Sequence, residues 1–196
     1  WGKHRGGPGI HGGIAPNGAG DLDGDGDLDL VCANTWYENA DGKGLRWTPH
    51  PNIPFGRVGG YGMCVRCAVA DLDKDGRPEL VMADCDISRS QIAILQNADG
   101  KGRQWIKQPL PQSFVYGSLH SLAVADFNGD GQLDIFSAEQ EEDLPPGRKD
   151  PKWVLWENQG KGKFVERIIF DGRLGGHESQ VADVDGDGDL DICSKA

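Results

Sequence analysis

Acidic segments of ten residues recur four times in this sequence, and each alternates carboxylates around a glycine. They read DLDGDGDLDL (21–30), DLDKDGRPEL (71–80), DFNGDGQLDI (126–135) and DVDGDGDLDI (183–192). Such a loop can wrap several oxygens around one hard cation, and calcium accepts 6–8 oxygen ligands in flexible geometry. The pattern therefore predicts calcium loops. Magnesium fits less well, because it demands near-octahedral geometry and keeps its waters.

The predicted ligands are the side chains at positions 1, 3, 5 and 9 of each loop and the backbone carbonyl at position 7. In the first two loops these are Asp21, Asp23, Asp25, Asp29 and the carbonyl of Asp27, then Asp71, Asp73, Asp75, Glu79 and the carbonyl of Arg77. In the last two they are Asp126, Asn128, Asp130, Asp134 and the carbonyl of Gln132, then Asp183, Asp185, Asp187, Asp191 and the carbonyl of Asp189. The glycine at position 6 of every loop stands where the chain must turn sharply.

An EF-hand is the obvious alternative, and the sequence excludes it. That loop requires a bidentate Glu at position 12, where this chain has Cys32, Met82, Ser137 and Ser194. An EF-hand also needs a helix on each side. The flanks here, such as LDLVCA, PELVMA and LDIFSA, are short apolar runs rich in Val, Ile and Leu, which favour strands. Each loop is therefore expected to join two strands.

Length, composition and charge agree with a calcium-binding all-β domain. The chain has 196 residues, 37% hydrophobic residues and 30 glycines, which suits one turn-rich domain. No stretch approaches the ~20 apolar residues of a membrane helix, so membrane insertion is not expected. The net charge of −11 argues against nucleic acid and anionic membranes as partners. The loops hold 17 of the 31 acidic residues. Four calcium ions would add about eight positive charges and bring the net charge to about −3.

The expected location is extracellular, either secreted or at the cell surface, because loops of this kind usually work at the calcium levels met by extracellular modules. The sequence starts at Trp1 and shows no signal peptide, so we interpret it as a processed product or a fragment. Cys64 and Cys67 form a C-x-x-C within a predicted strand, where an i, i+3 pair points to opposite faces. Buried thiols are therefore favoured over a zinc or redox motif.

A repeat of about 55 residues organises the chain, because the loops begin at positions 21, 71, 126 and 183. A second motif recurs in step with them: WYENADGKGLRW (36–47), ILQNADGKGRQW (94–105) and LWENQGKGKFV (155–165). Each repeat then holds four strands, A to D, with the calcium loop between A and B and the glycine-rich turn between C and D. Repeated four-stranded units of this length predict a β-propeller. The predicted repeats cover about 10–50, 58–110, 115–170 and 174–196 of a single domain, residues 1–196.

The loop and turn motifs together resemble the FG-GAP/VCBS repeats, which also build the propeller of integrin α subunits. The resemblance covers nearly the whole chain. More loosely, LHSLAVADFNGDGQLDIF and GGHESQVADVDGDGDLDI are similar to propellers of carbohydrate-active proteins such as aldos-2-ulose dehydratase. The resemblance implies an all-β propeller that usually has seven blades, of which this chain would hold about three and a half. Another chain, or a further segment, is then expected to complete the fourth blade, because a half-blade exposes a strand edge.

Strand order also predicts which residues meet at the propeller axis. Antiparallel strands place the calcium loops and the C–D turns on one face and the B–C and D–A connections on the other, which we call the top face. We expect His120, His177 and Glu139 to converge there as catalytic groups or as ligands of an additional transition metal. The expected ligand-binding residues on this face are His11, Tyr61, Arg66, Asp84, Tyr116 and Lys195. By the same register, Arg66 should lie near Asp84, His11 near Asn34, and His177 near Lys195.

Three functions remain open at this point. The first is a binding module that holds a carbohydrate or protein ligand on the top face. The second is a sugar lyase or dehydratase that uses acid–base or metal-assisted proton abstraction by His120, His177 and Glu139. The third reading is a structural subunit that assembles into a surface layer.

Overall fold

The computed structural model describes residues 10–195 and is built from strands, with no helix among the described residues. None of that part of the chain therefore forms a helix that could cross a membrane. The fold divides into two compact units. Unit 1 contains residues up to Asp84 together with Ile92–Pro109, and unit 2 contains Cys85–Gln91 and the residues from Leu110 onward.

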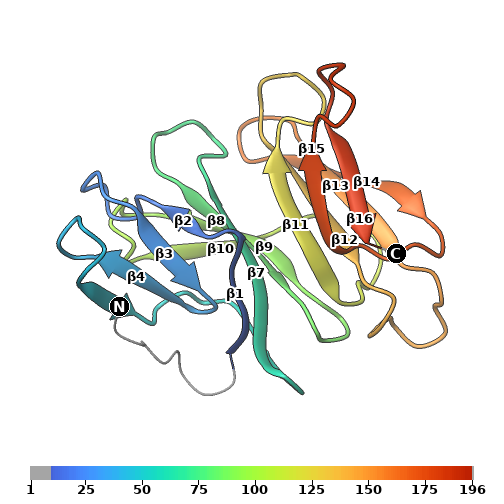
Figure 1. The fold of residues 1–196 in the computed structure, drawn as a ribbon, viewed down its shortest axis with the longest axis horizontal. Coiled ribbons are helices and arrows are strands. Elements are labelled where there is room, and N and C mark those ends of the chain that lie inside the picture. The colour runs from blue at the N-terminus through green and yellow to red at the C-terminus, as the bar shows by residue number, and fades with distance from the viewer. Residues whose placement is uncertain (1–9, 196) are drawn as a thin grey trace. The chain divides into compact units, whose positions relative to one another are not determined.

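Unit 1 contains two blades (Figure 1). The strands of the first blade pair antiparallel in chain order: β2 (Ala19–Gly20), β3 (Asp29–Cys32), β4 (Thr35–Asn39) and β5 (Trp47–His50). The second blade has β7 (Gly62–Ala70), β8 (Glu79–Asp84), β9 (Ile92–Asn97) and β10 (Trp105–Pro109), with short β6 (Val58–Gly59) paired to β7. The four-stranded blades that the sequence predicted are therefore present.

The first strand of the chain departs from the expected antiparallel pairing. β1 (Ile10–Asn17) runs parallel to β7 of the next blade, and only the two residues of β2 pair with β3. The ladder between β1 and β7 is irregular between Gly12 and Pro16. Pairing with β7 resumes at Pro16 and Asn17, and the chain enters β2 at Ala19.

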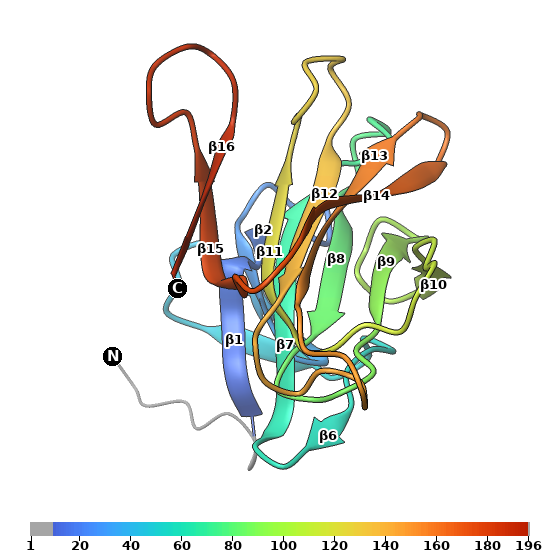
Figure 2. The same ribbon diagram turned by 90° about the vertical axis from the view of Figure 1, so that its right-hand side faces the viewer.

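Unit 2 contains one complete blade and half of another. The complete blade pairs β11 (Leu119–Ala125), β12 (Asp134–Glu139), β13 (Lys152–Asn158) and β14 (Phe164–Asp171) in chain order. The half-blade pairs β15 (His177–Ala182) with β16 (Asp191–Lys195). In Figures 1 and 2 the loops after β11 and β15 project from the same end of unit 2. The acidic loops of this unit thus lie at one end, as the strand order predicts.

The cores lie between neighbouring sheets of each unit. In unit 1, Val31 and Trp36 of the first blade pack with Val65, Leu80 and Leu95 of the second. Every residue of β8 is buried, which explains why its central residues, Leu80–Ala83, form a continuous apolar run rather than an alternating one. In unit 2, a smaller cluster of Phe136, Ala138 and Trp153 packs against residues of β15 and β16.

The glycine-rich turns between strands C and D are fixed by a buried asparagine. The Asn97 side chain accepts a hydrogen bond from Gly102 N (3.0 Å) and donates one to the carbonyl of Leu22 in the first acidic loop (2.7 Å). Asn158 makes related contacts in unit 2, where it accepts from Gly160 N (2.9 Å) and donates to Leu133 O (3.1 Å) in the acidic loop of its own blade. These asparagines therefore tie the turn to an acidic loop, which places both motifs at the same end of the strands.

Candidate functional site

The four acidic loops share one hydrogen-bond pattern. In the first loop, Asp21 Oδ2 accepts from Gly26 N (3.0 Å), Asp23 Oδ1 from Asp25 N (3.2 Å) and Asp25 Oδ1 from Asp27 N (2.9 Å). The same three bonds recur in the second, third and fourth loops. The glycine at position 6 has φ between 83° and 96° in all four loops, a backbone conformation that side chains rarely tolerate. The sequence repeat thus produces a structural repeat.

The carboxylate at position 9 closes each loop from the inside. Asp29, Glu79, Asp134 and Asp191 each accept a hydrogen bond from the amide at position 2, over 2.9–3.1 Å. The first three of these side chains are almost completely buried. Burial raises the pKa of Asp29 and Asp134, and it raises the pKa of Glu79 to about 7, with Asp73 and Asp75 adding to the effect. These carboxylates are therefore costly to ionise without a neighbouring cation.

The oxygen atoms of these loops fit a calcium ion. Carboxylate oxygens at positions 1, 3 and 9 lie within 4.8 Å of one another in the first, second and fourth loops. Calcium binds oxygen at 2.3–2.6 Å, so two of its ligands can lie at most about 5 Å apart. The donors are all oxygen, as a hard cation prefers. The residues present at the predicted positions therefore suit calcium.

Two loops depart from the common pattern. In the third loop, Asn128 replaces an aspartate and its amide donates to Asp130 Oδ2 (3.1 Å). In the second loop, the guanidinium of Arg77 forms an ion pair with Asp75 and so lowers the pKa of that carboxyl. Both changes reduce the negative charge that these two loops offer to a cation.

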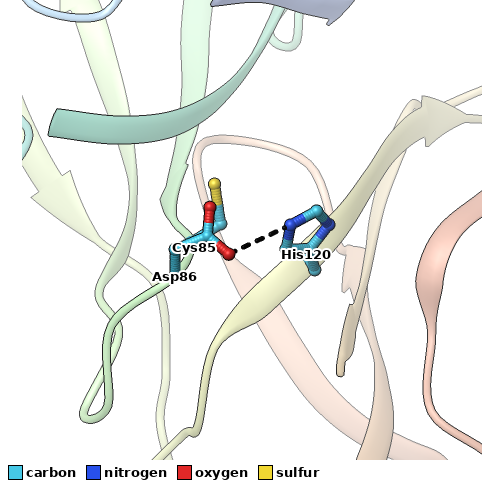
Figure 3. Close-up of side chains that lie close together, drawn as sticks. All are labelled: Cys85, Asp86 and His120. Atoms are coloured by element: carbon cyan, nitrogen blue, oxygen red, sulfur yellow. Dashed lines mark ion pairs between the residues drawn. The ribbon is translucent and has the colours of Figure 1, made fainter. Parts of the chain in front are cut away.

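At the opposite end of the unit 2 strands, the histidine pair forms as the sequence predicted. The rings of His120 and His177 stack with their centroids 4.0 Å apart and their planes 17° apart. His120 Nε2 also lies 3.3 Å from Asp86 Oδ1, and Cys85 is adjacent (Figure 3). Sequence reasoning missed Cys85 and Asp86, because they lie in an irregular segment after β8 that carries no motif.

Glu139 has a role other than the expected one beside His120. Its buried carboxylate forms an ion pair with Arg148 and accepts hydrogen bonds from Gly117 N and Lys152 N. These contacts anchor the long insertion between β12 and β13. Register predicted a contact with His120, since Leu119 pairs with Glu139. The partners of the carboxylate come instead from the insertion, from the start of β13 and from the segment before β11. The geometry therefore gives Glu139 a structural role.

Tyr116 corrects a further expectation. It is completely buried, and its hydroxyl donates to Glu166 Oε1 over 2.6 Å. Burial and this acceptor raise the pKa of Tyr116. The side chain is therefore a core residue and cannot stack on a sugar or donate a proton to a ligand. Tyr61, by contrast, is 71% exposed in the turn between β6 and β7 and remains accessible.

The other predicted ligand-binding residues lie at the ends of strands. Asp84 pairs in register with Val65, next to Arg66, but its carboxylate forms an ion pair with Arg57 at 2.8 Å, a partner that the sequence did not indicate. His11 lies opposite Cys64 in the β1–β7 ladder, and His177 lies opposite Lys195 in the β15–β16 ladder, as expected for that pair. The side chains of His11 and Lys195 are outside the described residues.

Unit 1 also contains a cavity of about 300 Å³ between its two blades. It lies at the end of the strands that carries the acidic loops, and the polar side chains along it are Asp21, Asp71, Arg77 and Asn97. The rest of the wall is formed by glycines and by small or apolar residues such as Leu22 and Val69. The cavity thus combines the borders of two acidic loops with an amide and a guanidinium, groups that can hydrogen-bond a polar ligand.

Four-stranded antiparallel blades with an acidic loop between the first two strands define this chain as part of a β-propeller. An FG-GAP-like repeat model matches residues 21–82, 71–137 and 144–194, and the chain therefore belongs to the FG-GAP-like repeat family. No curated protein sequence matches the chain. The similarity to propellers such as that of aldos-2-ulose dehydratase, expected from two sequence motifs, therefore remains a prediction.

Among solved structures, the chain is similar in fold to a lectin from Agrocybe aegerita, whose structure describes specific recognition of non-reducing terminal N-acetylglucosamine. The TM-score is 0.54 and the sequence identity is 21%. The match covers 89% of this chain but only 45% of the lectin, so the chain spans less than half of that protein. At this identity the similarity shows the fold alone.

Proposed function

We propose that this chain is a calcium-binding segment of an extracellular β-propeller that binds carbohydrate. The observation that carries the calcium part is the hydrogen-bond pattern common to the four loops, together with the carboxylates at positions 1, 3 and 9 that lie within 4.8 Å of one another in the first, second and fourth loops. Asp29 and Glu79 have raised pKa values without a cation. A bound cation would offset both the burial and the mutual repulsion of these carboxylates.

Isothermal titration calorimetry and native mass spectrometry with Ca²⁺ test this part. We expect four calcium ions per chain. Asp185→Asn, which copies the asparagine found in the third loop, should weaken one site and leave three unchanged. Asp41→Asn is the matched control, because Asp41 is an aspartate of a glycine-rich turn outside the acidic loops. Loss of a site in the control, or no saturable binding in the chain, would contradict the proposal.

The extracellular location is supported by the type of loop. Calcium sites of extracellular modules have dissociation constants of about 10⁻⁴–10⁻³ M, which only extracellular calcium fills. The second and third loops, with Arg77 and Asn128, suit this weak range. A dissociation constant near 10⁻⁷ M would instead favour a cytosolic calcium sensor.

The carbohydrate part has two supports in the described residues. Tyr61 offers an exposed aromatic ring on the predicted ligand face, and such rings provide a flat apolar surface with a polar hydroxyl. The cavity between the acidic loops of unit 1 offers hydrogen-bonding groups at the other end of the strands. The lectin of similar fold makes a glycan ending in N-acetylglucosamine the first ligand to test.

A glycan array followed by calorimetry on the calcium-loaded chain would test sugar binding. If the top face is the site, Tyr61→Ala should abolish binding and Arg77→Gln should leave it unchanged. The reverse result would move the site to the cavity between the loops. Absence of binding to any glycan would overturn the carbohydrate part while leaving the calcium part intact.

The sugar lyase or dehydratase remains an alternative, favoured by one observation. His120 contacts both the Asp86 carboxylate and the ring of His177, and a carboxylate beside an imidazole raises its basicity. The structural role of Glu139 removes one of the three residues first assigned to this chemistry. Turnover of a sugar acid that is lost in His120→Ala would favour this alternative over the binding module.

A further inference from the structure

Interruptions in two strand ladders present the histidines of unit 2 to each other. The pairing of β11 with β12 shifts between Leu119 and Ser121, which makes His120 the extra residue. The pairing of β15 with β16 shifts after His177, and Glu178 there has φ of 58°. Bulges of this kind redirect side chains and are frequent beside functional sites. Positive φ in a residue other than glycine adds strain that the surroundings must support.

A serine behind the histidines fixes their arrangement. Ser121 Oγ accepts a hydrogen bond from Ser179 N over 2.7 Å and donates one to the carbonyl of Gly176. This hydroxyl links β11 directly to the start of β15, and both serines are buried. The strands that carry the two histidines are therefore joined by one short side chain that bonds to the backbone of the other strand.

Two further side chains that can bind a metal, Cys85 and Asp86, lie close to His120 and come from the segment Cys85–Gln91. Asp86 has φ of 54°, and its amide donates to Ser118 Oγ over 2.8 Å, which fixes the segment to the start of β11. Its carboxylate then lies 3.3 Å from His120 Nε2. Cys85 is buried, and one donor atom from each of Cys85, Asp86 and His120 lies within 4.8 Å of the other two (Figure 3).

We propose that Cys85, Asp86 and His120 bind a transition-metal dication of the zinc class. Thiolate, imidazole and carboxylate are the three ligand types that zinc takes in proteins, whereas calcium takes oxygen ligands. Ligand atoms of a tetrahedral zinc site lie about 3.3–3.8 Å apart. A site whose donors already lie within 4.8 Å needs only small rotations of these side chains to close around the ion.

The ring of His177 stacks on His120 and so lies beside this group of ligands. Donor atoms of His120, His177 and Glu178 form a second group within 4.8 Å, which shares His120 with the first. His177 Nδ1 is buried and has no hydrogen-bond partner among the described residues. A buried ring nitrogen without a partner is costly, and a metal, or a ligand bound to that metal, would supply one. This site goes beyond the calcium and carbohydrate proposals and depends on neither.

Cobalt substitution tests the site through its thiolate ligand. The chain with reduced thiols and saturating calcium is titrated with Co²⁺, and the thiolate-to-cobalt charge-transfer absorption is followed; Zn²⁺ is then added to displace the cobalt. We expect one Co²⁺ per chain with this absorption, and its loss when zinc is added. Cys85→Ser should remove the absorption. Cys193→Ser, which removes an exposed thiol of the same unit, should leave it unchanged.

Asp86→Asn provides a second variant, because it keeps the shape of the side chain and is expected to fold. Mutation of residues that hydrogen-bond to metal ligands lowers metal affinity about 10–100-fold. Loss of the charge of a ligand itself should therefore weaken zinc binding at least as much. The calcium stoichiometry should not change. An absorption that survives Cys85→Ser, an unaltered zinc affinity in Asp86→Asn, or the absence of a saturable cobalt site would each overturn the proposal.

Discussion

Calcium binding to the second acidic loop should depend on pH near neutrality, because Glu79 must lose a proton before it can coordinate the ion. Burial raises the pKa of Glu79 to about 7, and the charges of Asp73 and Asp75 act in the same direction. At pH 8 the carboxyl is mostly ionised, and at pH 6 about nine in ten are protonated. The apparent calcium affinity of this loop should therefore fall about tenfold between pH 8 and pH 6, equivalent to ~1.4 kcal/mol.

The assay measures protons together with calcium. Calorimetric titration at pH 6 in two buffers of different ionisation enthalpy should show about 0.9 protons released by Glu79 for each calcium that the loop takes up. Glu79→Gln removes this contribution, so the difference between the two chains isolates it from Asp29 and Asp134. Equal proton release in the wild type and in Glu79→Gln would refute the reasoning.

The calcium-free protein should show the opposite pH dependence in its stability. A carboxyl whose pKa is raised on folding adds stability below its unfolded value of 4.5, and that stability is lost as the pH rises through about 7. In a calcium chelator, the melting temperature should therefore be higher at pH 6 than at pH 8. Saturating calcium should remove this difference, because the ion favours the charged form.

Three substitutions give further predictions. Arg77→Gln gives the second loop the residue that the third loop has at this position. It should raise the calcium affinity measured by calorimetry about threefold to tenfold, because a positive charge leaves the loop. Weaker binding would contradict this. Asn128→Asp should likewise tighten the third loop, which otherwise should be the first to lose its ion during chelation. Asn97→Ala should lower the free energy of unfolding in urea by about 2–4 kcal/mol, because the buried Gly102 N and Leu22 O lose their partner. Asn17→Ala, at an exposed position, should change it little. Equal effects of the two substitutions would contradict the role of Asn97.

Sequence reasoning was most successful where a motif repeats. The acidic loops and the glycine-rich turns occur in register, so one loop predicts the hydrogen bonds of the others, and the apolar runs after each loop predicted strands such as β8 and β12. The same regularity failed for β1, where the ladder is irregular between Gly12 and Pro16 and the strand pairs with β7 of the next blade.

At the candidate site, register predicted neighbours but not the direction of their side chains. His120 and His177 hold the same place before successive loops, and their contact followed from that alone. Glu139 and Tyr116 could not be placed this way, because Arg148 and Glu166, which bind them, come from an insertion and from an outer strand. Asp86 was missed since its approach to His120 depends on a left-handed backbone in an irregular segment.

Thermal unfolding with and without calcium tests the central claim most directly. At a calcium concentration ten times the dissociation constant, each filled site adds ~1.4 kcal/mol, so four sites add roughly 6 kcal/mol. For a chain of this size, that corresponds to a change in melting temperature of about 10–20 °C. We predict a fall of this size in excess EDTA and full recovery when calcium, but not zinc, is restored. An unchanged melting curve in EDTA would contradict the assignment of the four acidic loops as calcium sites.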